Sequence, residues 1–204
     1  MQRFTKYAIA PVLTLLASAA SAEEGGFYLK IFGGASNLDD TSVSGAFAGD
    51  ASFGSGFSTG AAFGYDYGTG PWRTELEFAY RTSDADTFAG GVTGDFASTS
   101  LMLNGYYDFA STGALTPFIG AGIGTVTEID WDITGGAAPG EYTDRGGLAF
   151  QLMAGADYAI SERISLTGEV RYFDAGSQTL SSGGANIDAD YATVEVLAGV
   201  VWKF

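Results

Sequence analysis

Acidic and basic side chains alternate with apolar ones in the stretch WRTELEFAYR, residues 72–81. Glu75 and Glu77 stand two positions apart there, with Arg73 and Arg81 beside them. Two neighbouring carboxylates could share the roles of general acid and general base. If the stretch is a strand, however, these four side chains project from one face, because a strand repeats every two residues. A ladder of salt bridges is therefore the simpler prediction, and catalysis by this pair is the weaker one.

Two residue types that often carry chemistry do not occur in the chain. It contains no histidine and no cysteine. Without imidazole, the usual general base for activating a serine or a water molecule is missing, and without thiols there are no Cys nucleophiles, thiolate metal sites or disulfides. We therefore expect no enzymatic activity, no catalytic residue, no cofactor and no metal centre. The formal charge of −15 also disfavours nucleic acid as a partner.

The first residues are typical of an export signal. Arg3 and Lys6 precede an apolar run over residues 7–17, and the small residues Ala20-Ser21-Ala22 follow it. This order indicates a secretory signal peptide, which is removed from the mature protein. We predict cleavage after Ala22, so that residues 1–22 are the signal peptide and residues 23–204 form one domain.

The rest of the chain shows hydrophobic alternation with a period of two. The clearest case is YATVEVLAGVVWKF, residues 191–204, in which Val194, Val196, Val200 and Trp202 share one apolar face. Seven earlier segments alternate in the same way over about ten residues, the length of a tilted membrane strand. The eight predicted strands cover residues 26–36, 57–67, 72–81, 99–109, 115–126, 148–160, 164–173 and 191–204.

The predicted connections alternate between short turns and long loops. The turns cover residues 68–71, 110–114 and 161–163, whereas residues 38–56, 84–98, 127–147 and 174–190 form long segments rich in Gly, Ser, Thr and Asp. This layout predicts an all-β fold, an eight-stranded antiparallel up-and-down transmembrane β-barrel. A soluble lipocalin-like barrel with its apolar face turned inward is the alternative.

Aromatic residues near both strand ends favour the membrane barrel, because such belts mark the two membrane interfaces. The turn-side belt comprises Tyr65, Tyr67, Trp72, Tyr107, Phe109, Tyr158, Trp202 and Phe204. The loop-side belt comprises Phe57, Phe78, Tyr80, Phe150 and Tyr172.

The strand face opposite the apolar one predicts the content of the barrel interior. An unpaired charge in so confined a space is costly, so we expect a connected network of salt bridges that includes the phenols of Tyr28 and Tyr106. Small residues such as Gly120, Gly122 and Gly124 are expected to leave room for large neighbours rather than to form a ligand site. The charged residues predicted for this interior network are Lys30, Asp66, Arg73, Glu75, Glu77, Arg81, Asp108, Asp157, Glu169, Arg171, Glu195 and Lys203.

The carboxyl terminus and several internal stretches resemble a known family. The pattern Gly199-x-x-Trp202-x-Phe204 resembles the signal by which the outer-membrane assembly machinery recognises its β-barrel substrates, although Leu197 stands where that signal usually has a polar residue. GAAFGYDYG, TELEFAYR, TPFIGAGIG, GEVRYFDAG and the terminal GVVWKF resemble the small eight-stranded outer-membrane barrels of Gram-negative bacteria. That family includes the OmpA transmembrane domain, OmpX, the opacity adhesins and porin-like surface antigens.

The resemblance implies a monomeric outer-membrane scaffold whose partners are membrane lipid, lipopolysaccharide and the barrel assembly machinery. The work of such proteins lies mainly in their loops, which here are acidic, so we expect a structural or surface-interaction role. Divalent cations or a surface ligand are the candidate partners of these loops, although no EF-hand-like ligand spacing supports a cation site. A narrow pore for small or hydrophobic solutes is the alternative function. The loop carboxylates are Asp39, Asp40, Asp50, Asp84, Asp86, Asp95, Glu128, Asp130, Asp132, Glu141, Asp144, Asp174, Asp188 and Asp190, with Arg145 as the main counter-charge.

Overall fold

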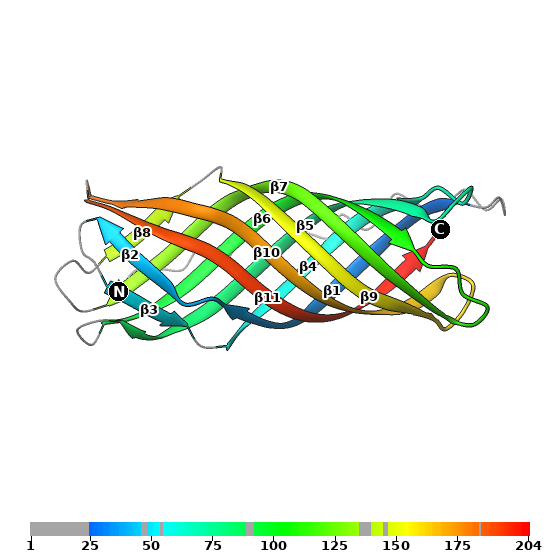
Figure 1. The fold of residues 1–204 in the computed structure, drawn as a ribbon, viewed down its shortest axis with the longest axis horizontal. Coiled ribbons are helices and arrows are strands. Elements are labelled where there is room, and N and C mark those ends of the chain that lie inside the picture. The colour runs from blue at the N-terminus through cyan, green and yellow to red at the C-terminus, as the bar shows by residue number, and fades with distance from the viewer. Residues whose placement is uncertain are drawn as a thin grey trace, which may run out of the picture.

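The computed structural model describes residues 25–45, 49–53, 55–88, 92–134, 140–144, 147–183 and 185–204, which form one antiparallel sheet closed into a tall barrel (Figure 1). The predicted signal peptide lies outside these residues. Among them, no helix is long and apolar enough to cross a membrane. The strands are β1 (Gly26–Leu38), β2 (Thr41–Gly45), β3 (Gly49–Phe53), β4 (Ser55–Asp66), β5 (Trp72–Phe88), β6 (Val92–Asp108), β7 (Leu115–Thr134), β8 (Gly140–Asp144), β9 (Leu148–Ala159), β10 (Ile164–Ser182) and β11 (Ala185–Lys203).

Eight of these strands make the wall of the barrel, as the sequence predicts. β1, β4, β5, β6, β7, β9, β10 and β11 each pair with the next in chain order. β11 then pairs with β1 from Tyr28↔Lys203 to Leu38↔Thr193, which closes the ring. The eight-stranded up-and-down topology is therefore confirmed.

The outer face of the wall is apolar and the inner face is charged. Leu152 and Val196 are 62% and 61% exposed, whereas Glu77 and Arg171 are 0% exposed. Water would favour the opposite arrangement, and only a lipid environment makes exposed apolar side chains of this density favourable. The lipocalin-like alternative, which requires the apolar face inside, is therefore wrong.

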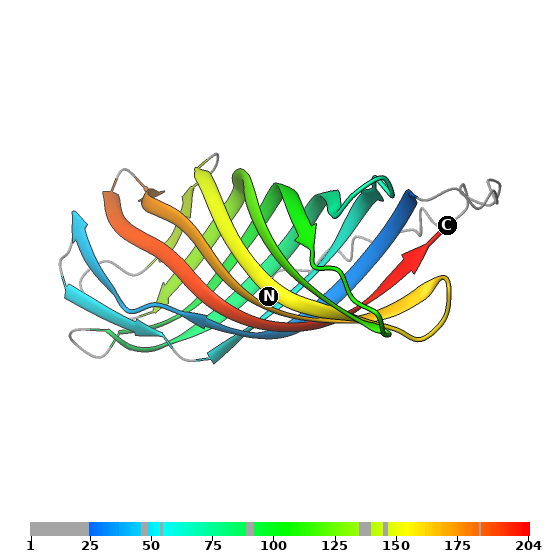
Figure 2. The same ribbon diagram turned by 45° about the vertical axis from the view of Figure 1, so that its right-hand side comes forward.

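The long segments predicted as loops are mostly strand. The predicted loop over residues 174–190 is almost entirely a hairpin of β10 and β11, paired out to Ser182↔Ala185. β5 likewise continues to Phe88 and β6 begins at Val92. β7 continues to Thr134, and β8 pairs with it from Ile129↔Asp144 to Ile133↔Gly140. β2 and β3 bridge β11 and β5. Figure 2 shows these strands continuing the barrel at the end opposite the carboxyl terminus.

We call this continuation the extension, meaning the described residues 39–45, 49–53, 83–88, 92–98, 127–134, 140–144, 174–183 and 185–192. The polarity of the strand faces inverts as the chain enters it. On β11, the inward positions change from the charged Glu195 to the apolar Tyr191 and Ile187, while the outward positions change from Val196 to Asp188. β7 carries a β-bulge opposite Thr99 and Ser100 of β6, and β10 carries another between Asp174 and Gly176. Each bulge inserts one extra residue, so the inward and outward positions of its strand are exchanged beyond it. The extension is therefore built like a soluble β-structure with its own core.

That core closes the loop-side end of the barrel from within. It packs Phe96 against Tyr191 with ring centroids 4.9 Å apart, and Trp131 is only 2% exposed. The buried cluster comprises Val43, Phe96, Ile129, Trp131, Ile133, Tyr142, Ala175, Leu180, Ile187, Ala189 and Tyr191 of the extension, together with Leu38, Met102, Val126, Ala149 and Phe173 of the adjoining wall.

Candidate functional site

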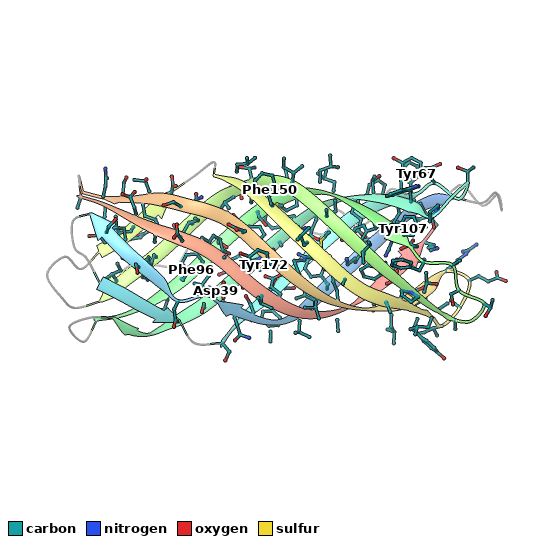
Figure 3. All side chains as sticks on the ribbon, in the orientation of Figure 1. Asp39, Tyr67, Phe96, Tyr107, Phe150 and Tyr172 are labelled. Atoms are coloured by element: carbon teal, nitrogen blue, oxygen red, sulfur yellow. The ribbon has the colours of Figure 1, made fainter. Side chains whose placement is uncertain are left out.

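The candidate site is the charged interior between the two aromatic belts, which Figure 3 places by Tyr67 and Tyr107 near one end and Phe150 and Tyr172 farther along. Seven of the predicted charged residues form one central network inside this part of the barrel. They come from four strands and are each at most 4% exposed. The members are Lys30 of β1, Glu75, Glu77 and Arg81 of β5, Glu169 and Arg171 of β10, and Glu195 of β11.

Arg171 is the hub of the central network. Its two terminal nitrogens donate to both oxygens of Glu77, each at 2.8 Å. Its Nε and Nη2 donate to Glu169 Oε1 at 2.9 and 2.7 Å, and Nη1 lies 3.7 Å from Glu195 Oε2. The other oxygen of Glu195 accepts a hydrogen bond of 2.6 Å from Arg81 Nε. Two arginines and three carboxylates are thus joined across the barrel.

Lys30 and two phenols extend the network toward the turn side. Lys30 Nζ donates to Glu169 Oε2 at 3.0 Å and lies 3.6 Å from Glu75 Oε2. Tyr28 donates its phenol to Glu75 Oε1 at 2.8 Å, and Lys30 donates to the phenol oxygen of Tyr106 at 3.5 Å. Both predicted tyrosines are therefore in contact with the network.

A second group lies nearer the turn-side mouth. Arg73 Nε is 3.0 Å from Asp108 Oδ1, and its Nη1 is 3.1 Å from Asp157 Oδ2. Lys203 pairs with Asp66 at 3.3 Å, but its side chain is 50% exposed. Lys203 therefore makes an ion pair with another predicted member of the interior network, but it does so at the mouth and not in the buried part of the barrel. The last residue of the last strand ends at the rim, where its ammonium reaches water.

Inward glycines make the room that these large side chains occupy. A Cβ on Gly64 would stand 2.2 Å from the Tyr28 ring, and one on Gly120 would stand 2.6 Å from the Tyr106 ring. One on Gly122 would stand 2.1 Å from the Asn104 side chain. The packing role predicted for the interior glycines is confirmed, since real Cβ contacts essentially never come so close.

Hydrogen bonds and ion pairs fix the carboxylates of the central network, which leaves them little freedom to take part in a reaction. Glu77 accepts hydrogen bonds from Arg171, from Asn104 Nδ2 at 3.2 Å and from Gln151 Nε2 at 3.3 Å. Glu75 is bound by Tyr28 and faces Lys30. Both carboxylates of the candidate acid–base pair are thus structural members of the network. In the described part of the chain, no three acidic side chains are arranged to hold a metal ion.

The extension carries an acidic row that sequence reasoning did not find. The strand register sets Asp84 of β5 opposite Asp95 of β6, Asp95 opposite Asp132 of β7, and Asp132 opposite Glu141 of β8. Asp95, Asp132 and Glu141 are all exposed. We call these four residues the acidic row. The sequence places all four in its predicted loops, and only the register aligns them.

The three residues of the predicted assembly signal lie at the turn-side end of β11. A Cβ on Gly199 would stand 2.4 Å from the carbonyl oxygen of Ile31. Trp202 and Phe204 are 50% and 40% exposed on the lipid side, with ring centroids 5.7 Å apart. Leu197, the departure from the family's pattern, is buried inside with Phe32 and Ala79. Recognition by the assembly machinery stays a prediction.

Comparison with known proteins identifies the family. The model of the outer membrane protein beta-barrel domain matches residues 8–204. Outer membrane protein PagN of Salmonella typhimurium is 27% identical over the full length of both chains. Among solved structures, Neisserial surface protein A shares 20% identity and a TM-score of 0.57, covering 89% of this chain and all of the other. Outer membrane protein W of E. coli shares 20% identity and a TM-score of 0.51, covering 90% of this chain and all of the other.

Proposed function

The chain belongs to the outer membrane protein β-barrel family and resides in the bacterial outer membrane, and from this premise we propose that it is a non-enzymatic scaffold presenting an acidic surface to cationic partners outside the cell. In this family short turns face the periplasm and longer connections face outward, so the extension is extracellular. The acidic row is the observation that carries the proposal.

Like charges placed directly opposite each other destabilise an antiparallel sheet. Asp95 stands opposite Asp132 on the neighbouring strand, and Asp132 stands opposite Glu141 on the next one. The carboxylates of the acidic row therefore repel one another across two successive strand pairs. A cationic partner would relieve this repulsion on binding. That gain is available only in the complex, so it favours association.

The rest of the extension has the same sign of charge. Its described residues include no lysine or arginine, and Arg145 lies outside the described residues. Its exposed carboxylates outside the row include Asp39, Asp40, Asp188 and Asp190. A surface of one sign steers an oppositely charged partner and accelerates its association in a salt-dependent way. A basic peptide segment or basic protein fits this surface better than a divalent cation, for which the described carboxylates are not arranged.

The scaffold is favoured over the two other functions considered. Catalysis lacks a free acid–base pair, because Glu75 and Glu77 are held in ion pairs. A narrow pore would have to cross two successive barriers: the central network and the apolar cluster of the extension. An eight-stranded barrel has an interior that side chains can fill.

The binding proposal is tested with an oligolysine peptide and the protein in lipid nanodiscs. We expect binding that weakens steeply as salt is added. Changing Asp95, Asp132 and Glu141 together to their amides should weaken it further, whereas Glu162→Gln in a turn on the periplasmic side should leave it unchanged. Equal binding by the triple variant and the Glu162→Gln variant would overturn the acidic row as the site.

Conductance separates the scaffold from the pore. The purified protein, inserted in planar bilayers, is expected to show no steady ion current. A steady current in the unmodified protein would favour the narrow channel instead.

A further inference from the structure

We draw no further inference here: the strongest candidate, the polar cavity of about 120 Å³ at the periplasmic mouth of the barrel, is lined by carboxylates that already pair with Arg73 and Lys203, and nothing in the described residues shows what would occupy it.

Discussion

Arg171 of β10 and Glu77 of β5 form a bidentate ion pair across the inside of the barrel, with two N–O distances of 2.8 Å, although 94 residues separate them in the chain. Both side chains are fully buried. Such forked pairs are among the stronger hydrogen-bonded contacts in proteins. Their energetic role, however, depends on whether one partner or both are removed, because a single remaining charge is buried without compensation.

Arg171→Ala should therefore destabilise the barrel by about 3 to 5 kcal/mol, since it leaves Glu77 with no cationic partner. The measurement is the unfolding midpoint in urea of protein refolded into lipid vesicles. The double variant Arg171→Met with Glu77→Gln should lose clearly less than Arg171→Ala. Current through planar bilayers should stay low in the single variant, because the apolar cluster of the extension still blocks the path. An unchanged midpoint in Arg171→Ala would contradict the view that Arg171 compensates the buried carboxylates.

Gly120→Ala should lower stability by about 1 to 3 kcal/mol, because the added methyl group overlaps the Tyr106 ring and the Met153 side chain. Ala121→Gly on the adjacent, exposed position is the comparison, and its effect should stay near or below about 1 kcal/mol. Urea titration of both variants in the same vesicles distinguishes them. A larger loss for Ala121→Gly would show that backbone flexibility, not interior packing, governs this strand.

Asp132→Asn should stabilise the protein, because Asp132 stands between Asp95 and Glu141 and meets a like charge on both sides. The expected gain is a few tenths of a kcal/mol to about 1 kcal/mol at low salt. The gain should shrink in concentrated salt, which screens exposed charges. A loss of stability at low salt would mean that Asp132 makes a favourable contact that outweighs the repulsion.

Deleting Phe204 should reduce insertion in cells and increase periplasmic degradation, if Gly199, Trp202 and Phe204 carry the assembly signal. Refolding into detergent should change much less, because the Phe204 side chain is 40% exposed and its ring contacts Trp202 at the end of β11. Fractionation of cells and heat-modified migration in SDS gels provide the two measurements. Equal losses in cells and in detergent would assign Phe204 a packing role.

Tyr191 should make stability fall at high pH. Burial in the extension raises the pKa of Tyr191 to about 12, and its phenol is hydrogen-bonded to Ser98 at 2.6 Å. A raised pKa means that the folded state holds the proton more tightly than the unfolded state, whose phenol has a pKa of about 10. The stabilisation is therefore complete below about pH 10 and is lost as the pH rises toward 12. Tyr191→Phe should flatten this part of the stability profile, and an identical slope in both proteins would exclude Tyr191 as the cause.

The membrane-spanning strands could be predicted because apolar residues that face lipid alternate with polar or small residues that face inward along their whole length. In residues 72–81, Leu76 and Phe78 face lipid while Glu75 and Glu77 face inward, and alternation alone separates the two sets. The charged members of the interior followed from the same rule. The individual pairs did not, because a contact such as Arg171 with Glu77 depends on the relative shifts of strands that are far apart in the chain.

The extension escaped sequence reasoning for a different physical reason. Ile129, Trp131 and Ile133 alternate with Asp130 and Asp132 as clearly as any membrane strand does. Outside the lipid, however, the apolar positions face inward, so the composition resembles that of an acidic loop. The alternation itself was the available signal, while the bulges that shift its phase could not be read from the sequence.

The paired strands of the extension also fix how far the acidic surface stands above the membrane. β10 continues for ten residues past Tyr172, to Ser182. At about 3.4 Å per residue and a tilt near 40°, its tip stands roughly 25 Å above the outer aromatic belt. A partner would therefore meet the acidic surface at a fixed distance above the outer aromatic belt. Because the hairpin is already ordered, docking would cost little conformational entropy on the protein's side, which distinguishes a rigid stalk from a flexible loop.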